Sequence, residues 1–287
     1  MQRMKAAHLV DARPDARAAL LPLPRPLMTG EVLDAAFRLF RAGLPGSLPY
    51  SAVMILLLYL PALWVIFMEE TAFPSLTSVF RGNYSPLGYL AIMTLSVPLL
   101  GVITLRLDAL ARGERPRFRL EAGTALLRWP AGWIATFGAF VIPVVLLWLG
   151  PAFSNGLSVD AIVFLSVPLF WPAALFVVAL PAFWCDRLGA IDAIVHSVTI
   201  SARKSWRMVG ALLATLCVVA VFYTLAAVIL AFLLPIFGRA DLILIAAIEQ
   251  LLYLVIGALG IPFVIAVLIV AYRDLELRER ERREFGG

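Results

Sequence analysis

The sequence is poor in the residues that most often carry out catalysis or bind metals. It has 287 residues but only two histidines, His8 and His196, and two cysteines, Cys185 and Cys217. Nucleophilic and metal sites need such side chains at defined spacings, and the chain shows no zinc spacing, no P-loop and no GxSxG motif. We therefore expect no catalytic residue, no metal site and no cofactor. The two cysteines lie at the end of one apolar segment and inside another, which predicts no disulfide framework.

Charged residues are also scarce, at 15%, whereas apolar residues make up 62% and the mean hydropathy is +0.93. Ordinary soluble domains contain about 25% charged and roughly 45–50% apolar residues. A water-soluble fold would be unable to bury this much apolar surface, so we expect the protein to lie in a membrane. The net charge of +5 does not indicate a nucleic-acid partner, because the basic residues are distributed as in a membrane protein.

Six apolar segments are long enough to cross a bilayer. A helix needs about 20 apolar residues to span a hydrocarbon core of roughly 30 Å. Backbone groups in lipid must be hydrogen-bonded within the chain, so the expected fold is all-α and polytopic, with six transmembrane helices. The predicted spans are residues 48–68, 86–105, 131–150, 161–185, 208–237 and 242–272.

The positions of arginine and lysine predict the orientation of these spans. All of the 24 basic residues except Arg81 and Arg239 lie before the first span, between the second and third, between the fourth and fifth, or after the sixth. Basic residues accumulate in cytoplasmic segments, so both termini are predicted to be cytoplasmic. The expected location is the cell inner (plasma) membrane, as a multi-pass protein.

The even-numbered spans share a pattern. Each contains an SVPL or GIPF element and ends with a basic residue close to an aspartate. The pattern indicates three parallel repeats, each an amphipathic interfacial helix followed by a transmembrane hairpin. Proline removes a helical hydrogen bond, so Pro98, Pro168 and Pro262 predict kinks that either frame a transport site or only shape the packing. The predicted organisation is a cytoplasmic arm at 1–28, one membrane domain at 29–274 with approximate repeats 29–112, 113–189 and 190–274, and a charged cytoplasmic tail at 275–287.

The third interfacial helix, at residues 190–209, has the clearest pattern. Its apolar residues recur at three- and four-residue steps, and polar and basic residues occupy the remainder. A basic amphipathic helix with a tryptophan is typical of the membrane surface. Weaker analogues are predicted at 29–46 and 117–133. The candidate lipid-headgroup or interfacial residues are Arg203, Lys204, Trp206 and Arg207.

The segment "ALPAFWCDRLGAIDAIVHSVTISARKSWRMVGALLATL" resembles a prokaryotic six-span membrane family. Its members are known as glycerophosphoryl diester phosphodiesterase membrane domains and related uncharacterised inner-membrane proteins. The resemblance implies a six-span fold and an inner-membrane location. The phosphodiesterase of some relatives would need clustered acidic and histidine metal ligands, so we do not expect that activity here. The residues that carry the resemblance are Asp186, Gly189, Ala193, Ile194, Ser197, Arg203, Lys204 and Trp206.

Glu249 is the one acidic or basic residue inside a predicted span, and Gln250 follows it. An ionisable group within a membrane is a candidate functional site, but Glu249 and Gln250 also suit a packing role in which they bond to neighbouring helices. We expect a non-enzymatic scaffold or lipid-interacting module of the envelope. Its partners would be membrane lipids, together with a membrane-protein complex or a second copy of the chain. The alternative is a small transporter or lipid-moving protein that uses the kinked even-numbered helices and Glu249.

Overall fold

The computed structural model describes residues 21, 23, 25–68, 86–139, 174–202, 205–237 and 242–285. The regular structure of these residues is helical and contains no strand, which confirms the all-α fold class. Four helices in this part of the chain include a segment long and apolar enough to cross a membrane. The predicted spans at 131–150 and 161–185, and Pro168 within the latter, lie wholly or mostly outside the described residues. The four segments are Thr29–Tyr59, Thr94–Ala111, Trp206–Phe232 and Ile248–Glu284.

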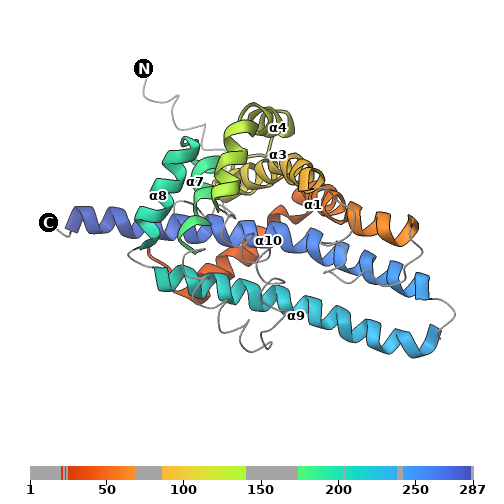
Figure 1. Cartoon of the computed structure of the whole chain (residues 1–287). Coiled ribbons are helices and arrows are strands. Elements are labelled where there is room, and N and C mark those ends of the chain that lie inside the picture. Colours follow the sequence, from red (N-terminus) through yellow and green to blue (C-terminus); the bar gives the residue numbers. More distant parts are fainter. Residues whose placement is uncertain are drawn as a thin grey trace, which may run out of the picture.

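Four long helices form the body of the protein: α1 (Thr29–Met68), α3 (Pro86–Ala111), α9 (Ser205–Phe237) and α10 (Leu242–Phe285). Helix α10 lies against both α1 and α9, and its C-terminal end projects beyond its neighbours (Figure 1). A helix that is apolar on every side must be surrounded by other apolar groups. The stretch from Ala266 to Tyr272 meets this requirement, because each of its residues is buried among the other helices.

Shorter helices pack against the end of α3 and the C-terminal half of α10 (Figure 1). They are α4 (Phe118–Leu127), a helix of residues 129–139, α7 (Ala179–Cys185) and α8 (Ala190–Ala202). Trp184 of α7 is completely buried where these helices meet α3. Its indole ring lies against Gly101 of α3 and Gly132, and a Cβ atom at Gly101 would lie 2.6 Å from the ring. The absence of side chains at these two glycines therefore makes room for the largest buried residue.

The outer face of α9 is apolar. Val221, Phe222 and Phe232 are 65%, 52% and 73% exposed, whereas the small residue Ala226 is 2% exposed and faces the other helices. In water, such exposed apolar residues would promote aggregation. On proteins, large exposed apolar patches commonly mark contact with a membrane or another protein. Small residues at helix contacts and large apolar residues outside are the arrangement expected when lipid is the solvent.

The first predicted interfacial helix and the first predicted span form one continuous helix, α1, so the expected separation between them is wrong. Pro45 and Pro49 lie at the expected junction but do not end the helix. Each proline removes only one intrahelical hydrogen bond, and packing on both sides can offset that loss. Gly43 and Gly46 face Leu107 and Arg106 so closely that a Cβ atom would overlap either side chain. Close packing against α3 thus stabilises the helical conformation of α1 at Pro45 and Pro49.

The sequence favours Thr29 as the N-cap of α1, because threonine is a common N-cap residue. The carbonyl of Met28 accepts the first helical bond, from Val32, at 2.9 Å, so Thr29 is instead the first helical residue. Glu31 accepts a 2.7 Å bond from the backbone N–H of Met28. This carboxylate satisfies an N–H at the positive end of the helix, as acidic residues in a first turn commonly do.

The other two predicted interfacial helices are shorter than expected. Helix α4 covers residues 118–127 of the predicted 117–133, and a second helix begins at residue 129. Helix α8 covers residues 190–202 of the predicted 190–209, and Trp206 already belongs to α9. On α8 the large apolar residues Ile191 and Val195 are exposed, and Ala193 and Ser197 are buried. The predicted apolar stripe therefore faces outward. The predicted continuation of the sixth helix into the charged tail is confirmed, because α10 runs without interruption to Phe285.

Candidate functional site: a charged cluster at one end of the helices

Segments that are distant in sequence meet at one end of the helices, which we call the charged end. It comprises the chain before α1, the end of α3, the connection from α7 to α8, the start of α9 and residues 272–278 of α10. The backbone N–H of Leu21 donates to the carbonyl of Ala111 at 2.9 Å, and that of Leu27 donates to Asp274 at 2.7 Å. These bonds attach the chain before α1 to the end of α3 and to α10.

Arg273 of α10 is the centre of the first ion-pair network. Its guanidinium lies 3.4 Å from Asp108 of α3, 2.8 Å from Asp186 after α7 and 2.7 Å from Glu276. The hydroxyl of Tyr272 also donates to Asp186. In the sequence, Asp108 and Asp186 are matching residues at the ends of even-numbered spans, and Asp186 also contributes to the family resemblance. The structure brings both to one arginine, and buried charges are tolerated when they are paired in this way.

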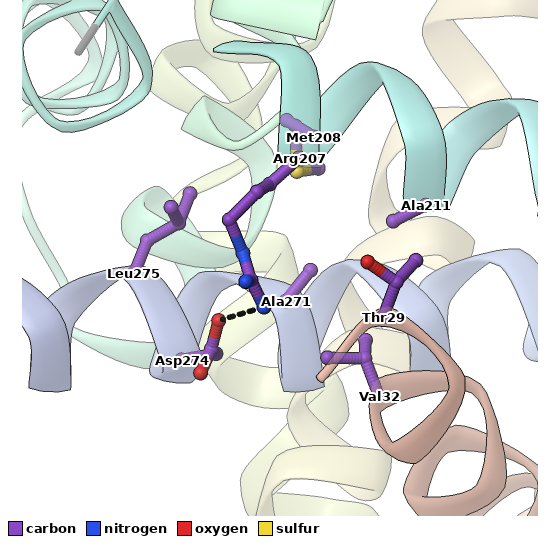
Figure 2. A pocket seen from close by; sticks show the side chains of 8 residues that line it. All are labelled: Thr29, Val32, Arg207, Met208, Ala211, Ala271, Asp274 and Leu275. Atoms are coloured by element: carbon purple, nitrogen blue, oxygen red, sulfur yellow. Dashed lines mark hydrogen bonds and ion pairs between the residues drawn. The ribbon is translucent and has the colours of Figure 1, made fainter. Parts of the chain in front are cut away.

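Asp274, the next residue on α10, is the centre of the second network (Figure 2). It is almost completely buried and lies 2.9 Å from Arg278 and 3.5 Å from Arg207 of α9. Both arginines also donate to the carbonyl of Leu27. Arg207, which the sequence indicated as a lipid-headgroup residue, is therefore engaged within the protein. A small cavity of about 20 Å³ beside Arg207 and Asp274 is lined by Thr29, Val32 and other residues. It is large enough for about one water molecule.

Helix α4 is attached to α3 through the buried carboxylate of Glu121. Glu121 is 5% exposed, accepts a 2.8 Å bond from the backbone N–H of Arg117 and lies 3.5 Å from the guanidinium of Arg106 on α3. Phe118, Leu126 and Leu127 are exposed on the same helix. Helix α4 thus has a polar anchor facing the protein and an apolar face outside, which is the distribution predicted for an interfacial helix.

Arg128, just after α4, is a residue that the sequence did not single out. Its guanidinium lies 4.1 Å from the centre of the Phe183 ring and donates to the carbonyls of Phe183, at 2.9 Å, and Leu188. Burial lowers the pKa of Arg128, and the nearby charge of Arg187 lowers it further. Arg187 itself has a φ of 56°, in the left-handed region that non-glycine residues rarely occupy. The positive charges of Arg128 and Arg187 therefore lie close together beside the connection from α7 to α8.

The remaining residues of the predicted interfacial site are placed only in part. Trp206 is 78% exposed at the start of α9, which suits a membrane-surface position. Arg203 and Lys204 lie outside the described residues. His196 of α8 is half-buried and packs edge-on against Tyr272, with ring centres 6.1 Å apart. The histidine therefore lies against α10 beside the Arg273 network.

Glu249 lies far from the charged end and is half-buried, like Gln250 beside it. Tyr253 lies one turn later on α10, and residues at this spacing are neighbours on a helix surface. The Tyr253 ring lies 5.5 Å from that of Tyr223 on α9, and Tyr223 in turn lies near Tyr59 on α1. Sequence analysis missed these tyrosines, because no spacing along one helix shows that three helices will meet. We call this group the Glu249–tyrosine cluster.

Two of the three singled-out prolines lie in described helices, Pro98 inside α3 and Pro262 inside α10. Pro98 has no N–H, so the carbonyl of Thr94 one turn earlier has no helical donor. The indole N–H of Trp129 donates to this carbonyl at 2.8 Å, and Trp133 donates to the Thr94 hydroxyl at 3.0 Å. Pro262 is separated from Glu249 by roughly 20 Å along the helix. The structure therefore does not bring Pro262 and Glu249 into one site.

Comparisons with known proteins add no relative to this description. No protein-family model, no curated protein and no solved structure matches the chain.

Proposed function

We propose that the chain is a non-enzymatic, multi-pass protein of the inner (plasma) membrane that crosses the bilayer six times, with its charged end in the cytoplasm. The single observation that supports this most strongly is the outward-facing apolar surface of α9, with Val221, Phe222 and Phe232 exposed. Such a surface is stable in lipid and costly in water. The basic segments of the sequence meet at the charged end, and the positive-inside rule assigns that end to the cytoplasm.

Within the membrane, the protein is proposed to act as a scaffold or lipid-interacting module. Helices α4 and α8 lie at the charged end, and their exposed residues include Leu127 on α4 and Ile191 and Val195 on α8. These residues would enter the lipid surface, and the arginines around them would meet anionic headgroups, each worth about 1 kcal/mol near such a surface. The Glu121–Arg106 pair would hold α4, and the Arg273–Asp186 pair the chain just before α8, at a fixed depth.

Immunoprecipitation of the tagged protein from cells in mild detergent, with quantification of lipids and proteins in the eluate, tests this proposal. We expect phospholipid, a partner protein or a second copy of the chain to remain bound after washing. The matched variant replaces Ile191 and Val195 with glutamine, which removes apolar contact at α8 but no charge, and should retain less lipid. A solitary protein without bound lipid would contradict the proposed function.

A second candidate function, movement of a small substrate or a lipid across the membrane, is favoured by the Glu249–tyrosine cluster. It joins α1, α9 and α10 through polar groups inside an apolar region, and such groups in membranes commonly lie on transport routes. In this function, proteoliposomes containing the protein would accelerate the flipping of a fluorescent phospholipid, and Glu249→Gln would abolish the effect. Tyr50→Phe, outside the cluster, is the control. Equal flipping by wild-type and Glu249→Gln proteins would exclude the role of Glu249.

A further inference from the structure

A groove of about 1010 Å³ lies at the charged end, between the end of α3, the first turns of α4 and the connection from α7 to α8. Its volume is at the upper end of the range of small-molecule sites. Four arginines and four carboxylates line it, together with apolar residues that include Leu120 of α4. The numbers of positive and negative side chains are equal, so the pairing of these charges decides whether the groove attracts an anion or a cation.

Most of the carboxylates are already neutralised. Asp108 lies 2.6 Å from Arg112 and 3.4 Å from Arg273, and Asp186 lies 2.8 Å from Arg273. Glu121 faces Arg106 at 3.5 Å. Arg106 and Arg273 are not among the residues that line the groove, so they approach these carboxylates from behind its wall. The acidic groups of the wall are therefore matched by additional positive charges from the core.

Two of the lining arginines remain available. Within the described part of the chain, no ion pair involves Arg117 or Arg187, and both are exposed. Arg117 bonds Glu121 only through its backbone N–H and carbonyl, so its guanidinium takes no part in anchoring α4. Arg187 is held in the left-handed conformation beside Arg128, whose side chain donates to backbone carbonyls. An anion in the groove would relieve the repulsion between Arg187 and Arg128.

The position of the groove points to a lipid as the source of that anion. Phe118, Leu126 and Leu127 are exposed on α4, and Leu120 is exposed on the wall of the groove itself. An apolar helix face of this kind lies at the boundary of headgroups and acyl chains. Arginine forks match the oxygens of a phosphate, and a headgroup at this depth would present one.

We propose that this groove binds the phosphate-bearing headgroup of an anionic phospholipid, with Arg117 and Arg187 as its principal ligands. The inference rests on the proposed function, which places the charged end against the membrane, and it gives that function a specific site. Glu114 is the remaining carboxylate of the groove, and no ion pair involves it among the described residues. Its negative charge should weaken binding, so Glu114→Gln should strengthen it.

The test is native mass spectrometry of the full-length protein in detergent, titrated with phosphatidylglycerol and, in a parallel arm, with phosphatidylcholine. We expect the wild-type protein to bind phosphatidylglycerol at least tenfold more tightly than phosphatidylcholine. The variant with Arg117→Gln and Arg187→Gln should lose about tenfold in affinity for phosphatidylglycerol. The control variant, with Arg280→Gln and Arg283→Gln, removes two exposed arginines of the α10 tail outside the groove and should bind like the wild type. Thermal melting in the same detergent checks that all variants are folded. If the double variant is destabilised, Arg187→Lys replaces it in the test. This variant keeps the charge and should retain most of the affinity.

The outcomes separate the groove from the broader function. Equal binding of phosphatidylglycerol by the groove variant and the wild type would overturn the groove site while leaving lipid interaction intact. A wild-type protein that retains no phospholipid at all would overturn both. A further arm uses soluble glycerol phosphate and inorganic phosphate. If either bound as tightly as phosphatidylglycerol, the ligand would be a soluble phosphate compound, and the lipid assignment would be wrong.

Discussion

The guanidinium of Arg273 lies 2.8 Å from the carboxylate of Asp186, and 87 positions separate the two residues in the sequence. The same guanidinium reaches Asp108 of α3. Three segments of the chain are therefore fixed to each other by one side chain, which is only 15% exposed. The attachment of α7 and α3 to α10 depends on charge pairing as well as on apolar contact.

We expect Arg273→Gln to destabilise the protein strongly. The substitution leaves Asp108 and Asp186 without their shared counter-ion, and removing one partner of a buried ion pair typically costs about 3–5 kcal/mol. The midpoint of thermal unfolding in detergent measures the change. Arg283→Gln is the control, since its side chain is 73% exposed and its pair with Glu279 contributes less than about 1 kcal/mol. Similar midpoints for the two variants would show that the Arg273 network has no structural role.

A second measurement separates the pairing from other effects of removing Arg273. If the arginine acts through Asp186, then Asp186→Asn should cost much less in the Arg273→Gln background than in the wild type. This comparison is a double-mutant cycle, in which residues of one network commonly show interaction energies of about 0.5–3 kcal/mol. Additive costs would show that the two residues contribute independently.

Substitutions of Gly101 and Gly123 by alanine should have opposite effects on stability, because Gly101 contacts Trp184 and Gly123 has open space around it. Gly101→Ala places a methyl group 2.6 Å from a ring that is completely buried, and overpacking of this kind costs about 1–3 kcal/mol. Gly123→Ala, inside α4, meets no atom within 4 Å and should stabilise the helix by about 0.5–1 kcal/mol. Chemical or thermal unfolding of both variants in the same detergent gives the comparison. Stabilisation by Gly101→Ala would contradict the packing of Trp184.

The bond from Trp129 to Thr94 predicts coupling between Trp129 and Pro98. Trp129→Phe should cost about 1–2 kcal/mol, because it removes the indole N–H that donates to the Thr94 carbonyl, to which Pro98 cannot donate. Pro98→Ala supplies a backbone N–H to that carbonyl, so the same Trp129→Phe change should cost less in the Pro98→Ala protein. Unfolding midpoints of the two single variants and the double variant measure this coupling. An identical cost in both backgrounds would show that Trp129 does not replace the missing helical bond.

Much of the architecture is predictable from patterns along the chain. The all-α fold follows from long apolar segments, and the continuous helix through the charged tail follows from its four-residue charge spacing, of which Asp274–Arg278 at 2.9 Å is the clearest case. The outward apolar face of α8 follows from the period of Ile191 and Val195. These features depend on residues close in sequence, where the spacing of a helix fixes the geometry.

Other features depend on contacts between distant segments, which periodicity does not specify. An interfacial helix separate from the first span was expected, but α1 is continuous, and Gly43 and Gly46 pack closely against α3 beside Pro45 and Pro49. Arg207 was expected to face lipid, yet its guanidinium meets Asp274. Arg128 carried no recognisable motif, because its partners are backbone carbonyls more than 50 positions away. Asp108 and Asp186 match at the ends of two even-numbered spans, but the spacing does not show that both pair with Arg273.

The most direct test of the central claim is the location of the C-terminus, measured with two reporters fused after Gly287. Green fluorescent protein fluoresces when it remains in the cytoplasm, and alkaline phosphatase is active only after export. If the charged end faces the cytoplasm, the fluorescent fusion will be bright and the phosphatase fusion inactive, in cells that contain equal amounts of membrane-bound protein. An active phosphatase with a dark fluorescent fusion would contradict the account, and a fusion recovered free of membranes would contradict the membrane assignment itself.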